Sequence, residues 1–347
     1  MSARSQLGRF LRGGRTSLLA ALNATGVANA VANSRWRRQR LLILCYHGIS
    51  LRDEHEWDPE LFVTPEFLRR RLQMLRDQRC NVLELGDAVE KLRSGNLPER
   101  SVALTFDDGF YNFAAAAVPL LEEFGFPATV YVSTYHCVNQ RPLLALSVRY
   151  LLWRARDRAG HSNLRDAAAR DARAQSLLSE ASALAPDRDA QLAWLAHFAS
   201  TLGEDWGGFL RERRLHLMTV AELTDVSRRG FDVQLHTHRH RTPRDVEAFR
   251  AEILQNRQIL EAATQRPATH FCYPSGDHDA MFLPILRDLG IKSATIGDPR
   301  LATAHDEPLL LPRFIDTLFQ PETVYRSWLA GPAALLSRHA PRVHVAG

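Results

Sequence analysis

Two adjacent carboxylates follow an apolar stretch that is typical of a buried strand. Asp107 and Asp108 lie in Thr105-Phe-Asp-Asp-Gly109, directly after the apolar residues 101–106. Neighbouring carboxylates repel each other, and burying them without a cation is costly. A divalent metal would relieve that repulsion, although turns also use Asp-Asp-Gly freely. The pair alone is therefore weak evidence for a metal site.

A cluster of histidines follows a second predicted strand. His236-Thr-His-Arg-His240 places three histidines within five residues, after the alternating segment 231–235. Neutral imidazole is the commonest side-chain ligand for zinc and similar ions. A His-x-x-x-His pair with one carboxylate would form a facial triad that leaves positions open for water and substrate. Taken alone, the histidines also fit a polar loop or a pH-sensitive surface.

The elements that must position these groups alternate between strand and helix. Apolar runs predict strands at residues 41–47, 81–85, 101–106, 128–133, 231–235, 269–273, 292–296 and 309–314. Amphipathic stretches predict helices at residues 65–78, 87–94, 112–124, 219–229, 243–264, 282–289 and 321–329. This order implies mostly parallel strands, in a doubly wound sheet or a closed barrel. The number of units favours an α/β protein with a distorted (β/α) barrel of about seven parallel strands, whose catalytic groups lie at the C-terminal strand ends.

The predicted barrel domain covers residues 41–330 and has one long interruption. Residues 137–216 are rich in alanine, arginine and leucine, and segments 143–154 and 191–202 have a helical period. We interpret this region as a helical insertion that is a lid over the site, a partner-binding surface or padding. Residues 331–347 are expected to form a C-terminal tail.

Residues 1–40 are predicted to form a basic N-terminal arm. They hold eight arginines and no acidic residue, so the formal net charge of +5 originates in this arm. Three interpretations remain: an interfacial helix attracted to anionic lipid, a poor signal peptide, and a solvated helix docked on the domain. No apolar run approaches the roughly 20 residues that a membrane span needs. The arginines are not interleaved with stacking aromatics, which argues against a nucleic-acid partner.

Four cysteines are scattered along the chain without any Cys-x-x-Cys spacing, at Cys45, Cys80, Cys137 and Cys272. This spacing argues against a zinc ribbon or a disulfide framework and predicts reduced core thiols. In the absence of a convincing export signal, the predicted location is the cytoplasm, with the inner face of the membrane as a second option.

The two polar clusters together resemble the motifs of the polysaccharide deacetylase family, also called the NodB homology domain. Its first motif is similar to residues 105–109, and its second, His-Ser/Thr-x-x-His, is similar to residues 236–240. The resemblance implies that Asp107 is the general base. It also implies a divalent metal, most often zinc, with cobalt, nickel or manganese as options. The metal ligands would be Asp108, His236 and His240.

A third motif of the family resembles Phe271-Cys-Tyr-Pro274-Ser-Gly276. The family places the backbone amide that binds the oxyanion just after the proline, which is Ser275 here. The usual arginine of this motif is absent, and Arg313 is the candidate to supply its charge beside Asp107. The late Leu-x-His that donates a proton in many members also has no clean counterpart.

The segment Cys45-Tyr-His-Gly48 resembles the Tyr-His segment that opens the longer bacterial branch of the family. His47 is therefore the candidate proton donor, and the alternative is a histidine merely packed at a strand end. The predicted substrate contacts are Tyr111, Tyr273 and Pro274.

The resemblance implies a metal-dependent hydrolase that removes N-acetyl groups from an amino-sugar polysaccharide, oligosaccharide or glycan precursor. One alternative is a metal-dependent amidohydrolase that acts on a non-sugar amide. Another is a catalytically silent scaffold in surface-polysaccharide assembly, because a fold alone does not establish an activity.

Overall fold

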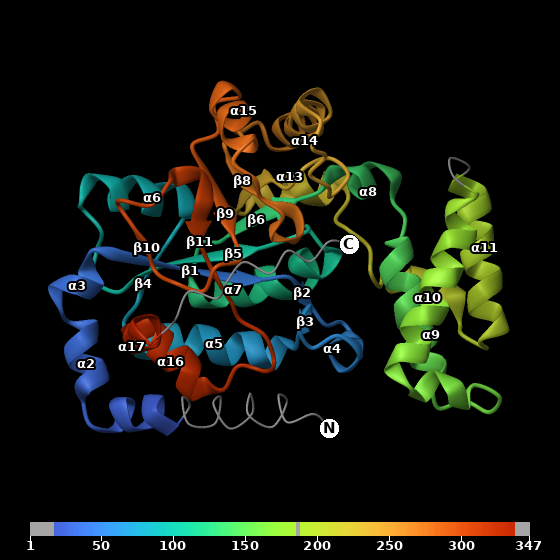
Figure 1. Cartoon of the computed structure of the whole chain (residues 1–347), viewed down its shortest axis with the longest axis horizontal. Coiled ribbons are helices and arrows are strands. Elements are labelled where there is room, and N and C mark those ends of the chain that lie inside the picture. Colours follow the sequence, from blue (N-terminus) through green and yellow to red (C-terminus); the bar gives the residue numbers. More distant parts are fainter. Residues whose placement is uncertain (1–16, 185–187, 337–347) are drawn as a thin grey trace.

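The computed structural model describes residues 17–184 and 188–336, and its centre is a mostly parallel sheet that is nearly closed into a barrel (Figure 1). The barrel strands follow one another in the order β1 (Arg40–Tyr46), β5 (Ser101–Phe106), β6 (Thr129–Val132), β7 (Asp232–Leu235), β8 (His270–Cys272) and β9 (Ser293–Ile296). Every neighbouring pair in this series is parallel. The predicted (β/α) barrel is confirmed.

Two very short strands close the barrel. β11 (Leu311–Pro312) pairs with β9, and β12 (Phe314–Ile315) pairs with β1. Arg313 lies between the two strands, so residues 311–315 form a closing segment that joins the last strand of the series to the first. The single strand expected at 309–314 is therefore wrong in detail. The chain enters through the 3-10 turn η4 (Pro308–Leu310) and then changes its pairing partner at Arg313.

Shorter strands extend the edges of the barrel. β4 (Asn81–Leu83) pairs with the beginning of β5, and β10 (Ala302–Thr303) pairs with the beginning of β1. The β10 pairing is antiparallel and was not predicted. β2 (Gly48–Ile49) and β3 (Phe62–Val63) form a separate two-stranded parallel sheet directly after β1.

Helices surround the barrel, and side-chain caps mark where several of them begin. The helices are α5 (Pro65–Asp77), α6 (Leu85–Ser94), α7 (Val118–Phe124), α13 (Val220–Arg228), α14 (Val246–Thr264), α15 (Phe282–Asp288) and α16 (Glu322–Ala330). Thr64 caps α5 and Thr219 forms a capping box on α13. The helix expected from residue 243 begins at Val246, because the Asp245 side chain accepts the Ala248 amide.

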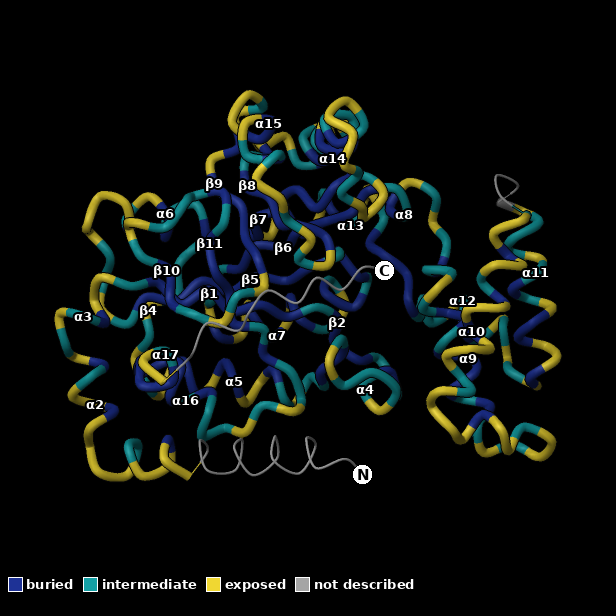
Figure 2. The backbone as a smooth tube through the Cα atoms, viewed as in Figure 1, coloured by how far each residue is buried: buried dark blue, intermediate teal, exposed yellow. Residues whose placement is uncertain are grey.

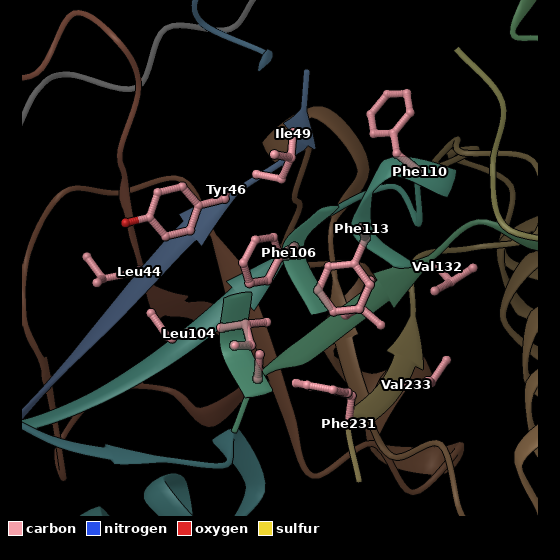
Figure 3. Close-up of a cluster of buried hydrophobic side chains, with 14 of the residues drawn as sticks. Leu44, Tyr46, Ile49, Leu104, Phe106, Phe110, Phe113, Val132, Phe231 and Val233 are labelled. Atoms are coloured by element: carbon pink, nitrogen blue, oxygen red, sulfur yellow. The ribbon is translucent and has the colours of Figure 1, made fainter. Parts of the chain in front are cut away.

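The expected helix 112–124 consists of two parts. Residues Phe113–Ala117 form the π-helix η1, and α7 follows it. The widened turn carries the Phe113 ring, whose centroid lies 4.9 Å from that of Phe106 and 6.1 Å from that of Phe231. Figure 3 shows these rings in the core between the strands and the helices. A run of alanines gives no periodic signal for a π-turn.

Alternate residues of the strands face two different cores. Leu42 and Leu44 belong to the large cluster under the surrounding helices, whereas Leu41 and Ile43 belong to a second cluster. That second cluster fills the barrel interior and packs against α6, and it includes Ala103, Tyr131, Cys272 and Leu311. Figure 2 shows how completely the strands are buried.

Residues 137–216 fold mainly as a helical lobe beside the barrel (Figure 1). After α8 (Thr134–Asn139) the lobe contains α9 (Leu144–Ala155), α10 (Ala167–Ser182), α11 (Arg188–Thr201) and α12 (Trp206–Arg211). The lobe has its own apolar cluster, centred on residues such as Leu151, Leu177 and Phe198. The segments predicted as helical correspond to α9 and α11, and α10 was not predicted.

The described part of the N-terminal arm packs on the barrel domain. Residues 17–40 include α2 (Val27–Ala32) and α3 (Arg35–Arg38), and α2 lies against α16. The Leu19 side chain is fully buried, and the Asn23 amide donates to the Thr323 carbonyl and to Ser327 Oγ at 3.2 and 3.0 Å. These contacts match the docked-helix interpretation for residues 17–40. Residues 1–16 lie outside the described residues.

The beginning of the predicted tail is also ordered against the domain. α17 (Pro332–Leu335) follows α16, and its Ala333 is buried. Residues 337–347 lie outside the described residues. Within the described ranges, no helix has both the length and the apolar character that crossing a membrane requires.

Candidate metal centre and active site

A cavity of about 1050 Å³ opens at the C-terminal ends of the barrel strands. It is lined by polar side chains that follow β1, β5, β7, β8 and β9, as expected for a β/α barrel. Eight of the predicted site residues line it: His47, Asp107, Asp108, His236, His240, Tyr273, Ser275 and Arg313. Tyr111 and Pro274 are not among the lining residues. The Tyr111 ring instead lies under the Arg213 guanidinium at 4.0 Å.

Two histidines converge on one carboxylate oxygen. His236 Nε2 lies 3.2 Å and His240 Nε2 lies 3.1 Å from Asp108 Oδ1. His236 Nδ1 lies 2.8 Å from the Cys272 carbonyl, which accepts its proton and leaves Nε2 free as a ligand. One carboxylate and two imidazoles suit zinc and related divalent ions, and the three ligand atoms are close enough to share one ion. The residues present therefore fit a divalent metal.

Left-handed backbone conformations occur at four residues of the site. The φ angles of Asp108, Thr237, His240 and Ser275 lie between 54° and 71°. Residues other than glycine and asparagine rarely adopt this backbone conformation, and such strain is often concentrated at functional sites. The following Gly109 is also left-handed at φ 83°, and a Cβ there would lie 2.7 Å from Val132 Cγ1. Glycine at position 109 is therefore required by the close approach of β6 as well as by the turn.

Helix α14 supports the histidine loop, residues 236–240, through two buried side chains. The buried Asn256 accepts the His236 amide at 2.9 Å and donates to the Val132 carbonyl and to Thr134 Oγ1. The buried Glu252 accepts the Arg239 amide at 2.7 Å and the Arg241 side chain at 2.8 Å. These contacts fix both ends of the loop that carries the two candidate ligands.

Asp107 has different surroundings from its neighbour Asp108. Arg313 Nη1 and Nη2 donate to Asp107 Oδ1 and Oδ2, both at 2.7 Å, in a bidentate pair. Burial alone would raise the pKa of Asp107, but the Arg313 guanidinium more than offsets this and lowers that pKa. Asp107 is therefore held as a carboxylate. Arg313 occupies the role foreseen for it beside Asp107.

Two buried thiols complete the surroundings of Asp107. Cys45 Sγ and Cys272 Sγ lie 3.5 and 3.3 Å from Asp107 Oδ2. Burial raises the pKa of both thiols, so they remain protonated. Other groupings of possible ligands include Asp107 with Cys45 and His47, or with His236 and Cys272. They suit a cation less well, because the Arg313 guanidinium already occupies both oxygens of Asp107.

His47 and Ser275 are the two other predicted catalytic residues that line the cavity. His47 Nε2 is 3.9 Å from Asp107 Oδ2, and the His47 side chain is 22% exposed. Ser275 lies in the 3-10 turn η3 (Pro274–Gly276) directly after β8, and both residues line the cavity. Both residues thus face the same cavity as the candidate metal ligands.

Several cavity residues were missed from the sequence. His278 lines the cavity, and its Nδ1 lies 2.8 Å from the Gly276 carbonyl. Arg300 lines it as well and pairs with Asp298 at 2.8 Å and Asp306 at 2.5 Å. Their position just after β8 and β9 was a usable signal, because polar residues at the C-terminal ends of barrel strands tend to face the site.

Comparisons with known proteins show which family and which proteins this chain resembles. A family model described as polysaccharide deacetylase matches residues 94–164 and 204–294. The poly-beta-1,6-N-acetyl-D-glucosamine N-deacetylase of Escherichia coli strain K12 is 29% identical over 99 residues, which are 28% of this chain and 14% of that protein.

Solved structures share the fold at low sequence identity. The Streptococcus pyogenes deacetylase PplD, in complex with acetate, matches with a TM-score of 0.56 and 18% identity, over 83% of this chain and 97% of its own. IcaB from Ammonifex degensii matches with a TM-score of 0.54 and 16% identity, over 84% and 97%. The family match over residues 94–164 and 204–294, together with the shared fold, identifies this region of the barrel as a polysaccharide deacetylase domain of the NodB type.

Proposed function

We propose that this chain is a metal-dependent hydrolase that removes N-acetyl groups from an amino-sugar polymer or its precursor. The observation that carries the proposal is the side-by-side arrangement of two differently held carboxylates. Asp108 faces two imidazoles, and Asp107 is held ionised by Arg313. A base next to a metal site, in an open cavity, is what amide hydrolysis requires.

Each residue of the candidate site can carry out one part of the amide hydrolysis. The chemistry that a divalent cation supplies when held by Asp108, His236 and His240 is Lewis acidity toward an amide carbonyl and an attacking water. Asp107 accepts the proton of that water. The Ser275 amide donates to the oxygen on which negative charge develops, and His47 gives a proton to the departing amine nitrogen.

The substrate class comes from the relatives. The E. coli relative is named for poly-β-1,6-N-acetyl-D-glucosamine, but the matched segment is only 14% of its length. We propose a related N-acetylated glucosamine polymer for this chain. Its cavity of about 1050 Å³ lies at the upper end of the usual range for ligand pockets, and Tyr273 lines it. The cytoplasmic location and the contact of the arm with anionic membrane stay predictions.

Acetate release measured together with metal content tests the proposal. Purified protein is incubated with β-1,6-linked and β-1,4-linked N-acetylglucosamine oligomers and with simple N-acyl amides, with and without a chelator. We expect acetate from the oligomers, its loss with chelator and its return when zinc is added back. Faster turnover of the simple amides would favour the amidohydrolase alternative. Metal-loaded protein that hydrolyses none of the substrates would favour the scaffold.

A further inference from the structure

A second buried ion pair lies on the outer side of the closing segment. Arg71, on α5, donates from Nε to Asp316 Oδ2 at 2.9 Å and from Nη2 to Asp316 Oδ1 at 3.2 Å. Their side chains are 1% and 0% exposed. Asp316 follows β12 directly and is three residues after Arg313. The closing segment is therefore anchored by a bidentate pair on each side, with Asp107 inside the barrel and Arg71 outside it.

Asp316 also binds the strand that leads to His47. Tyr46 Oη donates to Asp316 Oδ2 at 3.0 Å, and the Asp316 amide donates to the Cys45 carbonyl at 3.1 Å. Figure 3 shows Tyr46 on the helix-facing side of β1, beside Phe106. One carboxylate thus joins α5, the end of β1 and the closing segment.

Besides Asp107, the Arg313 guanidinium donates to Thr105 Oγ1 at 3.1 Å and to Cys272 Sγ at 3.0 Å, but the backbone that carries it has few ladder hydrogen bonds. β11 and β12 each pair through only two residues, and strands that short contribute few ladder hydrogen bonds. Arg71 itself is firmly placed. Its guanidinium lies 4.3 Å from the Phe67 ring and 4.4 Å from the Tyr325 ring, and it donates to the Gln320 carbonyl at 2.6 Å. Arg71 is therefore a fixed point against which the closing segment is held.

We propose that Arg71 and Asp316 are positioning residues of the active site, which hold Arg313 against Asp107 and, through Tyr46, hold His47 beside it. This proposal rests on the hydrolase function proposed above. A buried ion pair stabilises a fold no better than well-packed apolar residues of similar size. Its directional hydrogen bonds, however, fix the geometry of what they join. A displacement of about 1 Å at a catalytic group lowers turnover by about 100-fold.

Single substitutions test the proposal against a matched control. Arg71→Met and Asp316→Asn are expected to lower kcat for acetate release about 10- to 100-fold, with KM changed less than about twofold and metal content unchanged. Tyr46→Phe removes one hydroxyl and is expected to lower kcat less. The control is Arg37→Met. Arg37 is just as buried, but it binds the Leu329, Arg40 and Ser101 carbonyls at the other end of β1. It is expected to lose stability and keep kcat.

A double-mutant cycle separates positioning from general damage. In an Arg313→Lys background, adding Arg71→Met should lower kcat less than about twofold further, because Arg71 acts on Asp107 through Arg313. A full multiplication of the two losses would overturn the proposal. So would an equal loss of kcat in Arg37→Met. If Arg71→Met does not fold, the same cycle is run with Asp316→Asn, which keeps the shape of the side chain.

A crystal structure of the Asp316→Asn variant gives a measurement that does not depend on activity. We expect at least one of the two 2.7 Å contacts between Arg313 and Asp107 to be lost. Persistence of both would overturn the positioning proposal even for an active enzyme. A wild-type protein without acetate release would overturn the proposed function, and the variant structure would still decide whether Asp316 positions Arg313.

Discussion

At the scale of single residues, two neighbouring aspartates receive opposite surroundings. Asp107 directly follows β5, its amide donates to the Tyr46 carbonyl at 2.9 Å, and its side chain meets Arg313. Asp108 takes the left-handed conformation, which turns its side chain toward His236 and His240. One peptide unit thus separates a candidate base from a candidate ligand.

Substitutions at these aspartates should separate turnover from metal binding. Asp107→Asn keeps the shape but not the basicity, so acetate release should fall by about 10²- to 10⁴-fold with metal content intact. Asp108→Ala and His236→Ala should lose the metal, because each removes one of three ligands. Elemental analysis and an acetate assay on the same preparations measure both. Equal metal loss in all three variants would contradict the assignment of roles.

His270 predicts a pH dependence of stability that is separate from catalysis. It is buried in β8, its Nδ1 lies 2.8 Å from Ser293 Oγ, and burial lowers its pKa from 6.5 to about 4. The unfolded chain therefore binds a proton between pH 6.5 and 4 while the folded chain does not. The buried neutral His270 therefore contributes fully to the free energy of unfolding above pH 6.5. That free energy decreases by up to about 3 kcal/mol as the pH falls.

Denaturant unfolding across this pH range measures the effect of His270. The slope of unfolding free energy against pH should be smaller in His270→Gln, which retains a donor for Ser293. Carboxylates such as Asp316, whose pKa burial raises to about 6, affect both proteins equally and cancel in the comparison. Parallel curves for the two proteins would show that His270 does not carry the dependence.

At the scale of elements, helix α14 acts as the support of the histidine loop. Its buried Asn256 and Glu252 bind backbone and side-chain groups on the loop that carries His236 and His240. Ligands held by such hydrogen-bonded partners bind metal more tightly than freely moving ones. The geometry of the candidate metal centre is therefore determined by a helix that lines no part of the cavity.

Loss of Asn256 should weaken metal binding before it abolishes folding. Asn256→Ala removes three buried hydrogen bonds, and we expect about 10- to 100-fold weaker zinc affinity and a loss of about 3 kcal/mol in stability. Zinc titration against a competing chelator measures the first. Gln258→Ala, at an exposed position of the same helix, is the control. Equal zinc affinity in both variants would argue against the support role.

Much of the element order followed from local sequence patterns, but the contacts between distant elements did not. The strand 101–106 was foreseen, and so was the grouping of the candidate ligands Asp108, His236 and His240, because apolar runs and polar strand ends are local signals. The Arg71–Asp316 pair gave no such signal, since it depends on which strand closes the barrel. The predicted substrate contacts include Tyr111 and Pro274, which do not line the cavity. The residue type alone does not determine which way a side chain points in a turn.

At the scale of the whole molecule, the helical lobe has an apolar cluster of its own, while Tyr150, Trp153 and Phe209 of the lobe belong to the large barrel cluster. The lobe cluster contains Leu151, Leu177 and Phe198, and no residue of 137–184 or 188–216 lines the cavity. This argues against a lid that contacts the reacting group in the described conformation. A partner surface or a structural role remains for the lobe.

Damage to the lobe core should therefore stay within the lobe. Phe198 is 8% exposed and its ring stacks on Trp194 at 5.5 Å, so Phe198→Ala should cost about 3 kcal/mol locally. Hydrogen exchange should show lost protection in α9 to α11, with zinc binding unchanged. The comparison variant Phe271→Ala, in the barrel core, should lose protection and zinc together. Loss of zinc in Phe198→Ala would show that the two cores are coupled.

The closing segment also determines when, during synthesis of the chain, the candidate site becomes complete. All three candidate metal ligands have been synthesised once His240 has left the ribosome, and folding during synthesis proceeds from the N-terminus. The partner of Asp107 arrives only with Arg313, and its outer anchor only with Asp316. A nascent chain therefore contains all three candidate ligands well before the candidate base has its charged partner. The contact between Asp107 and Arg313 can form only near the end of synthesis.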